Sequence, residues 1–186
     1  QKAVEKTVKE FGKLDILVNN AAFQKHQNSI EEISLEDWDK TFKTNIYGYF
    51  YMVRAALEHF QEGSVIINTG SITGLEGNKD LLAYSSTKGA IHAFTKSLAQ
   101  ILVEKGIRVN CISPGPIWTP LNVADKEPED VAKHGADTPM ERSTTRMRST
   151  STIRATLRNV VRPRLSSAAH SRATAAFFDD LTTTLP

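Results

Sequence analysis

Residues 64–68, Ser-Val-Ile-Ile-Asn, form a short apolar stretch that predicts a buried β-strand. It is rich in Val and Ile and does not alternate between polar and apolar residues, which is typical of a parallel strand covered on both faces. Two similar stretches lie elsewhere in the chain, Asp-Ile-Leu-Val-Asn at 15–19 and Arg-Val-Asn-Cys-Ile at 108–112. We therefore predict three short strands.

The segments between these strands have the period of α-helices. Apolar residues recur at helical spacing at Trp38, Phe42, Ile46, Tyr49 or Phe50, Val53 and Leu57, and again at Ile91, Phe94, Leu98 and Leu102. A third, shorter helix is indicated by Val4, Val8 and Phe11.

The ends of the two long helices are also marked in the sequence. Ser34 and Asp37 have the spacing of a capping box, and Gly106 with Lys105 indicates a helix C-terminus. The order strand, helix, strand, helix, strand predicts an α/β fold, a partial Rossmann-like doubly wound parallel sheet. In such a sheet, ligands bind at the carboxyl ends of the strands.

The bulk properties exclude several other classes of protein. The chain has 186 residues, of which 40% are hydrophobic and 24% charged, with a net charge of +2. We therefore expect neither a nucleic acid nor a membrane as partner. The N-terminus does not resemble a signal peptide, and the single cysteine, Cys111, excludes an internal disulfide framework and a zinc cluster. A cytoplasmic location is the expectation.

Residues with chemical potential follow the predicted strands. Tyr84 and Lys88 are four residues apart at the start of the second long helix and therefore share a face. An ammonium near a phenol favours the phenolate, so we predict that Lys88 lowers the pKa of Tyr84 and makes it a usable acid and base. Ser71, after the second strand, can bind a substrate oxygen, and Asn45 can hold a water that connects the lysine to solvent.

Each of these residues, taken singly, also fits a structural role. Tyr-x-x-x-Lys occurs by chance on many helices, and a serine after a strand is usually a cap or a turn residue. His26 is more often a solvated side chain than a substrate ligand, and Cys111 fits a small core residue. It is the joint pattern, with every element at a strand end or on a helix face, that indicates an enzyme.

That joint pattern resembles the short-chain dehydrogenase/reductase superfamily. The likeness covers residues 1–142 and rests on Asn19-Asn20-Ala21-Ala22, on Asn45, Ser71, Tyr84 and Lys88 in order, and on Pro114-Gly115 after the third strand. Residues 68–74, 114–119 and 138–140 further resemble a bacterial subgroup of general-stress-protein-like aldehyde and alcohol reductases. One departure is Ala22, where the family usually has glycine.

The resemblance implies an NAD(P)-dependent oxidoreductase that acts on an aldehyde, ketone or alcohol. Its catalytic residues would be Asn45, Ser71, Tyr84 and Lys88. Its cofactor-binding residues would be Asn20, Ala21, Tyr84, Lys88, Pro114, Gly115, Ile117 and Thr119, with no metal. The family often forms dimers or tetramers through its two long helices, so a homo-oligomer is implied as well.

The two ends of the chain depart from the family pattern. No glycine-rich turn precedes Asn19, so we expect the first three strands to be missing, the first remaining strand to form an exposed apolar edge, and NAD and NADP to remain indistinguishable. We also expect the last strand to be missing.

From Arg142 onward the sequence has eight arginines and no lysine, and it is rich in Ser and Thr. Our hypothesis is that residues 143–186 are out-of-frame translation, with a genuine anion-binding tail as the alternative. We expect the chain as written to have impaired activity. A non-catalytic binding or regulatory protein, or an inactive pseudogene product, is the alternative reading.

Overall fold

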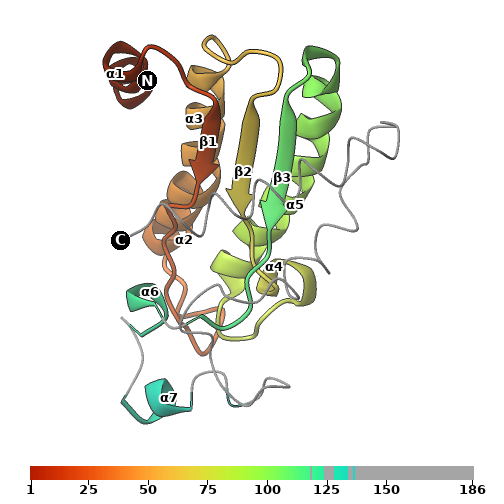
Figure 1. Ribbon diagram of the computed structural model, residues 1–186. Coiled ribbons are helices and arrows are strands. Elements are labelled where there is room, and N and C mark those ends of the chain that lie inside the picture. Colours follow the sequence, from red (N-terminus) through yellow and green to blue (C-terminus); the bar gives the residue numbers. More distant parts are fainter. Residues whose placement is uncertain (118, 124–127, 134–135, 137–186) are drawn as a thin grey trace.

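A computed structural model describes residues 1–117, 119–123, 128–133 and 136 of the chain. The predicted tail at 143–186 lies outside the described residues. The described residues form a small three-stranded sheet with long helices on one face (Figure 1). The predicted α/β class is therefore confirmed.

The three strands lie where the sequence predicts them. They are β1 (Ile16–Asn19), β2 (Val65–Thr69) and β3 (Arg108–Ile112), all parallel, in the order β1-β2-β3. The register aligns Leu17 with Ile66 and Ile66 with Val109, so these three side chains share one face of the sheet. That face is the one covered by the helices.

The helices that connect the strands carry most of the chain. The first connection comprises α2 (Leu35–Phe42), a π-helical turn η1 (Lys43–Tyr47) and α3 (Gly48–Ala56). The second comprises the short α4 (Thr73–Glu76), the long α5 (Leu82–Leu102) and a 3-10 turn η2 (Val103–Lys105). Helix α1 (Lys2–Phe11) precedes the sheet, and α6 (Pro120–Val123) and α7 (Pro128–Ala132) follow it.

The predicted helix boundaries are confirmed where capping residues mark them. The Ser34 hydroxyl accepts a hydrogen bond of 3.0 Å from the backbone N–H of Asp37 and so caps α2. Gly106 ends η2 in the left-handed region, at φ 66°. A side chain there would also come within 2.5 Å of Cγ of Glu62, so glycine is required twice over.

The core fills the space between the sheet and the helices. Its largest cluster joins α3, α5 and the strands and consists of Leu17, Val53, Ala56, Ile66, Leu98, Leu102, Ile107 and Val109. A second cluster, of Tyr49, Ile91 and Cys111, lies next to it. Complete burial of an aliphatic side chain such as that of Ile66 contributes roughly 1.5–3 kcal/mol. Cys111 is 4% exposed and is a core residue, as predicted.

One helix differs from its sequence prediction. The stripe from Trp38 to Leu57 predicts a continuous α-helix, but the π-helical turn at Lys43–Tyr47 interrupts it. A π turn inserts an extra residue and rotates the following helix face. As a result Tyr49 is buried whereas Phe50, its alternative in the stripe, is 47% exposed.

Strand β1 lies at the edge of the described sheet, as predicted, and its face away from the helices is exposed as well. Ile16 is 48% exposed and Val18 is 57% exposed, and among the described residues β1 pairs with β2 alone. Phe11, at the end of α1, is also exposed although its spacing placed it on the apolar face of that helix. None of the described helices is long and apolar enough to cross a membrane.

Candidate active site

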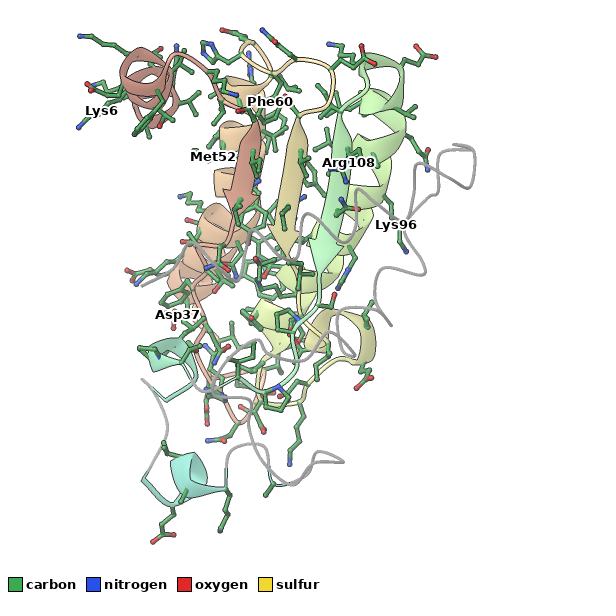
Figure 2. The ribbon with its side chains drawn as sticks, in the orientation of Figure 1. Lys6, Asp37, Met52, Phe60, Lys96 and Arg108 are labelled. Carbon is green, nitrogen blue, oxygen red and sulfur yellow. The ribbon has the colours of Figure 1, made fainter. Side chains whose placement is uncertain are left out.

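The predicted site residues lie at the carboxyl ends of the strands. All three strands point toward the same edge of the sheet, where α4 and the loops after β1, β2 and β3 gather (Figure 1). Asp37 lies toward this edge and Phe60 lies at the opposite end (Figure 2). The topology alone therefore brings residues from three distant parts of the chain together.

Ser71 begins the turn between β2 and α4, and its hydroxyl is held by a neighbour. The Ser71 Oγ accepts hydrogen bonds from the backbone N–H of Thr73 at 3.2 Å and from its hydroxyl at 2.9 Å. The Ser71 side chain also lies close enough to Tyr84 on α5 to influence the pKa of the phenol. Because both acceptor sites of the oxygen face Thr73, the serine proton is free to point toward Tyr84.

Tyr84 and Lys88 lie on α5, with the lysine behind the tyrosine. The Lys88 ammonium is 5.2 Å from the centre of the Tyr84 ring and donates a hydrogen bond of 2.6 Å to the carbonyl of Thr69. Lys88 is 1% exposed. Burial disfavours the charged amine and lowers the pKa of Lys88 to about 8.

The pKa of Tyr84 is shifted in the direction opposite to our prediction. Burial raises the pKa of the Tyr84 phenol, and the nearby Ser71 side chain opposes that shift. The prediction considered only the nearby ammonium and left out the burial of the phenol, which is the largest cause of the shift. In this structure, then, Tyr84 is a protonated acid at neutral pH.

Asn45 is completely buried in the π-helical turn and makes three hydrogen bonds. Its Oδ1 accepts from the backbone N–H of Phe23 at 2.7 Å, and its Nδ2 donates to the carbonyl of Phe23 and to Thr87 Oγ1, each at 3.0 Å. Both amide protons are therefore in use. The side chain binds the loop after β1 to the residue that precedes Lys88.

The residues predicted to bind a cofactor lie on two loops at the same edge. Asn20 and Ala21 follow β1 and are exposed, and Asn20 Oδ1 accepts a hydrogen bond from Thr69 at 3.0 Å. Pro114, Gly115, Ile117 and Thr119 follow β3 and are half-buried. The two loops after β2 and β3 are joined by a hydrogen bond of 3.2 Å from Ile72 N–H to the Pro114 carbonyl.

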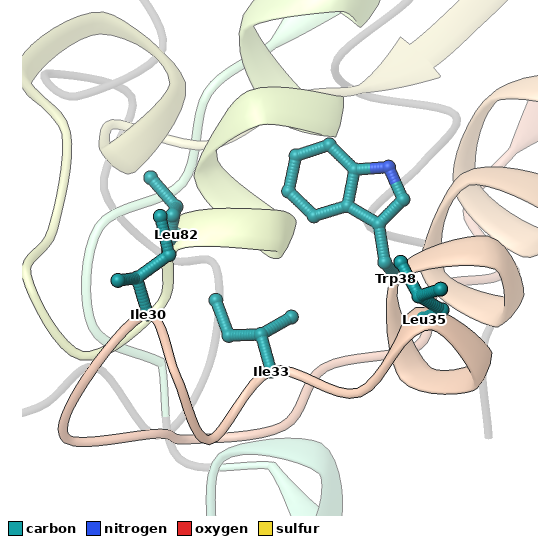
Figure 3. Close-up of a pocket in the computed structure, with 5 residues that line it drawn as sticks. All are labelled: Ile30, Ile33, Leu35, Trp38 and Leu82. Atoms are coloured by element: carbon teal, nitrogen blue, oxygen red, sulfur yellow. The ribbon is translucent and has the colours of Figure 1, made fainter.

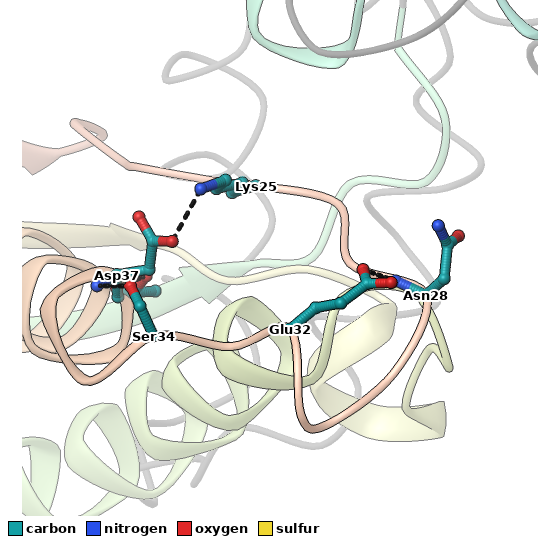
Figure 4. Close-up of polar contacts among 6 residues, drawn as sticks. Lys25, Asn28, Glu32, Ser34 and Asp37 are labelled. Carbon is teal, nitrogen blue, oxygen red and sulfur yellow. Dashed lines mark hydrogen bonds and ion pairs between the residues drawn. The ribbon is translucent and has the colours of Figure 1, made fainter.

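The loop after β1 is fastened to α2 by charged groups. The Lys25 ammonium lies 2.7 Å from the Asp37 carboxylate, beside the Ser34 cap (Figure 4). The Lys25 hydrogen bond is the main reason why the pKa of Asp37 is lowered. Farther along α2, Lys40 lies 4.3 Å from the centre of the Phe23 ring. These contacts fix the conformation of the loop that follows β1.

An apolar hollow of about 200 Å³ opens beside this loop. It is lined by Ile30, Ile33, Leu35, Trp38 and Leu82 (Figure 3). None of these side chains can transfer a proton, so the hollow itself is not the chemical centre. Its wall on α5, Leu82, is two residues before Tyr84, which makes it a surface for an apolar group next to the site.

Three contributors were missed by sequence reasoning. Thr73 donates a hydrogen bond to the Ser71 hydroxyl, and Thr87 accepts one from Asn45. The Thr69 carbonyl accepts a hydrogen bond from the Lys88 ammonium. Thr73 carries a weak local signal, because a hydroxyl two residues after Ser71 is typical of a turn. The Thr69 carbonyl carries no sequence signal, since a backbone carbonyl is present at every residue. Among the described residues, no cluster of His, Cys, Asp and Glu could hold a metal ion.

Comparison with known sequences identifies the family. A family model described as enoyl-(acyl carrier protein) reductase matches residues 1–156. Two relatives from Bacillus subtilis are the uncharacterized oxidoreductase YhdF, 59% identical over 142 residues, and General stress protein 39, 56% identical over 140 residues. They cover 76% and 75% of this chain, and each is matched over 49% of its own length. A glucose and ribitol dehydrogenase of Daucus carota is 49% identical over 143 residues, 77% of this chain and 49% of that protein.

Solved structures agree with the sequence comparison. A 3-ketoacyl-(acyl-carrier-protein) reductase from Brucella melitensis, complexed with NADH, is 34% identical with a TM-score of 0.69 and covers 77% of this chain and 59% of its own. A short-chain dehydrogenase from Burkholderia cenocepacia, in complex with NADP, is 31% identical with the same TM-score, covering 77% of this chain and 58% of its own.

The chain belongs to the short-chain dehydrogenase/reductase family, which has an NAD(P)-binding Rossmann fold. Its relatives include General stress protein 39, so the predicted subgroup is confirmed. The chain spans about half the length of the curated relatives it matches.

Proposed function

We propose that the protein to which these residues belong is an NAD(P)-dependent oxidoreductase that interconverts a carbonyl compound and its alcohol. The observation that carries this proposal is the position of the buried Lys88 ammonium, 5.2 Å from the centre of the Tyr84 ring and hydrogen-bonded to the strand end that leads into Ser71. Two hydroxyls that meet at one point, next to a buried cation, can bind and protonate a single oxygen atom.

The residues present fit the nicotinamide end of such a cofactor. An ammonium has three protons, and the hydrogen bond to Thr69 uses one of them, so Lys88 retains donors for hydroxyl groups of a ribose. Among the described residues, Gly115 has only the Ile72 Cδ1 near the position of a side chain, at 3.8 Å, so a flat ring can approach its backbone. When bound, the nicotinamide supplies or accepts the hydride. Asn20, Ala21, Pro114, Ile117 and Thr119 are the proposed neighbours.

Tyr84 is the proposed proton donor to the carbonyl oxygen during reduction. Its raised pKa keeps the phenol protonated at neutral pH, as a donor requires. Ser71 holds the same oxygen and stabilises the charge that develops on it. Lys88 is charged below about pH 8 and stabilises the phenolate that remains after the proton has left.

Asn45 has a positioning role in this proposal. Both of its amide protons are bound to protein atoms, so its side chain fixes the Phe23 loop and Thr87. A relay water, which was predicted from the sequence, would be held by Lys88 and by backbone groups of the π-helical turn. The proposed substrates are small aldehydes, ketones and alcohols, and the name of the carrot relative adds sugars and sugar alcohols to the compounds to be tried.

The proposal is tested by following reduced cofactor with a panel of aldehydes, ketones and sugars. The assay is run on this chain and on the longest natural protein that contains it, with NADH and NADPH. We expect Tyr84→Phe to lower kcat by about 100-fold or more, and Ser71→Ala by about 100- to 1,000-fold. Tyr51→Phe, on the exposed surface of α3, is the matched control. Turnover that survives in Tyr84→Phe would refute the assignment, and a longer protein with no turnover would favour the non-catalytic alternative.

A homo-oligomer and a cytoplasmic location stay predictions. Helix α3 and the turn before it expose three aromatic residues, Tyr47, Phe50 and Tyr51, whose rings contact one another. Such a cluster is a suitable centre for an interface. Sedimentation of the protein and of a Phe50→Glu variant would test it, because a charge at the centre of the interface should produce monomers.

A further inference from the structure

The ring of His92 lies between three segments of the candidate site. His92 follows Lys88 by one turn of α5, as Lys88 follows Tyr84. Its Nε2 atom is 3.2 Å from the carbonyl oxygen of Ser71 and 3.3 Å from the hydroxyl of Ser113. Ser71 follows β2 and Ser113 follows β3, so a single ring atom connects α5 with both loops.

The ring is packed tightly against the backbone that precedes Ser71. A side chain at Gly70 would come within 2.8 Å of His92 Cε1 and within 2.8 Å of Cys111 Sγ. The residues on either side of Ser71 are bonded to the chain after β3. The Gly70 N–H donates a hydrogen bond to the carbonyl of Ile112 at 2.7 Å, and the Ile72 N–H donates one to the carbonyl of Pro114. The half-buried His92 ring is therefore packed against the joined ends of β2 and β3.

The two contacts determine which ring nitrogen carries a proton. The Ser71 carbonyl oxygen is only an acceptor, so the hydrogen bond to it requires a proton on Nε2. The Ser113 hydroxyl can accept from the same proton because it is both a donor and an acceptor. A ring with a bare Nε2 would instead direct a lone pair toward the carbonyl and would repel it.

We infer that His92 is a positioning residue for Ser71. Its Nε2–H holds the main chain of the serine, while Thr73 holds the hydroxyl, so the side chain is fixed from both ends. Through Ser113, the same ring ties the serine to the Pro114–Gly115 loop. That this serine acts on substrate rests on the proposed function; the structural part of the inference does not.

The protonation state can be observed without any substrate. Long-range ¹H–¹⁵N spectra of the histidine-labelled chain distinguish a protonated from a bare Nε2, and His92→Gln identifies the signal of His92 by its loss. We expect a proton on Nε2. A bare Nε2 would overturn the inference, whatever the activity of the protein.

Amide exchange tests whether the ring holds the serine turn. The amides to follow are those of Ile72, which bonds Pro114, and Gly74, which bonds the Ser71 carbonyl at 3.1 Å. We expect His92→Leu to speed exchange at both by about tenfold, because a hydrogen bond to the turn is lost. His92→Gln keeps a donor and should restore the wild-type rates. His59→Leu, in the turn after α3, is the matched control. Unchanged exchange in His92→Leu would also overturn the inference.

Kinetics adds a separate readout where the wild-type protein turns over. We expect His92→Leu to lower kcat by about 10- to 100-fold, with rescue by His92→Gln and little change in the KM of the carbonyl substrate. A wild-type protein without turnover would count against the proposed function alone, since the spectra and the exchange rates still decide the role of His92.

Discussion

The ammonium of Lys88 donates its short hydrogen bond to the backbone carbonyl of Thr69, at 2.6 Å, rather than to the tyrosine beside it. Thr69 is the last residue of β2 and directly precedes Gly70 and Ser71. The lysine therefore connects α5 to the end of the central strand. It has a structural role in addition to the role proposed for it in proton transfer.

The first prediction concerns the pH dependence of stability. The pKa of Lys88 is about 8 in the folded protein and 10.5 for an unperturbed lysine, so the unfolded chain binds the proton more tightly. Between these pH values the unfolded state holds more protons, and the contribution of Lys88 to the free energy of unfolding rises with pH. We expect wild type to gain on the order of 3 kcal/mol relative to Lys88→Met from pH 8 to 10.5.

Urea unfolding of both proteins at several pH values measures this difference. Lys96→Met, in which a surface lysine of the same helix is replaced, is the control and should follow the wild-type profile. If the Lys88→Met and wild-type profiles run parallel through this range, the amine is not desolvated as the structure implies.

The second prediction concerns the three hydrogen bonds of Asn45. Asn45→Ala leaves the Phe23 N–H and carbonyl, and the Thr87 hydroxyl, without this partner in a buried place. We expect the free energy of unfolding to fall by roughly 2–4 kcal/mol. Asn28→Ala is the control, because Asn28 is exposed and bonds Glu32 through its backbone N–H. A loss below 1 kcal/mol, equal to that of the control, would contradict this account.

The third prediction concerns the close approach of α4 and α5. A Cβ atom at Gly74 would lie 2.5 Å from the carbonyl carbon of Lys88 and 2.7 Å from the amide nitrogen of Gly89. Because these are backbone atoms, Gly74→Ala must push the helices apart, which costs about 1–3 kcal/mol. The shift would also displace Ser71, three residues before.

Thermal unfolding compares Gly74→Ala with Gly48→Ala. A Cβ atom at Gly48 meets only the Lys43 carbonyl oxygen at an ordinary 3.7 Å, inside a helix where alanine is favoured. We expect Gly48→Ala to be neutral or stabilising. Equal melting temperatures for the two variants would show that the packing of α4 on α5 is looser than described.

The fourth prediction concerns the exposed face of β1. Val18 is 57% exposed on an edge strand, which favours association between chains. Val18→Lys should slow aggregation, measured by light scattering, with little change in stability. Ile101→Lys adds the same charge at an exposed position on α5 and should have less effect. An equal improvement in both variants would assign the effect to net charge.

Much of this fold can be predicted from local sequence, because local patterns determine it. Strand β3 coincides with its predicted residues, and the Ser34 cap and the Gly106 terminus depend on side-chain chemistry that is readable from one residue. The π-helical turn at Lys43–Tyr47 was missed because its residues are ordinary helix residues. Within this turn Asn45 hydrogen-bonds a loop 22 residues away, and local sequence does not report such a tertiary contact.

In the candidate site, too, some features could be predicted from the sequence and others could not. The sequence sufficed to predict that Asn45, Ser71, Tyr84, Lys88 and both loops lie at one end of the sheet, since the topology places the strand ends together. The direction of the Tyr84 pKa shift could not be predicted, because spacing reveals a neighbouring charge but not the depth of burial. His92 was missed for a related reason. Its partners are the Ser71 carbonyl and the Ser113 hydroxyl on separate turns, which no period in the sequence reports.

The parallel register has a consequence for how the chain folds. Asn19 and Asn68, whose side chains bond at 2.9 Å across β1 and β2, are 49 residues apart in the chain. Every strand pairing in this sheet has to close a loop of this order, whereas the helices form from near neighbours. Folding of such a topology is slow because the chain loses the entropy of loop closure before the strand pairs can stabilise it. The nascent sheet therefore depends on α3 and α5 to gather its strands.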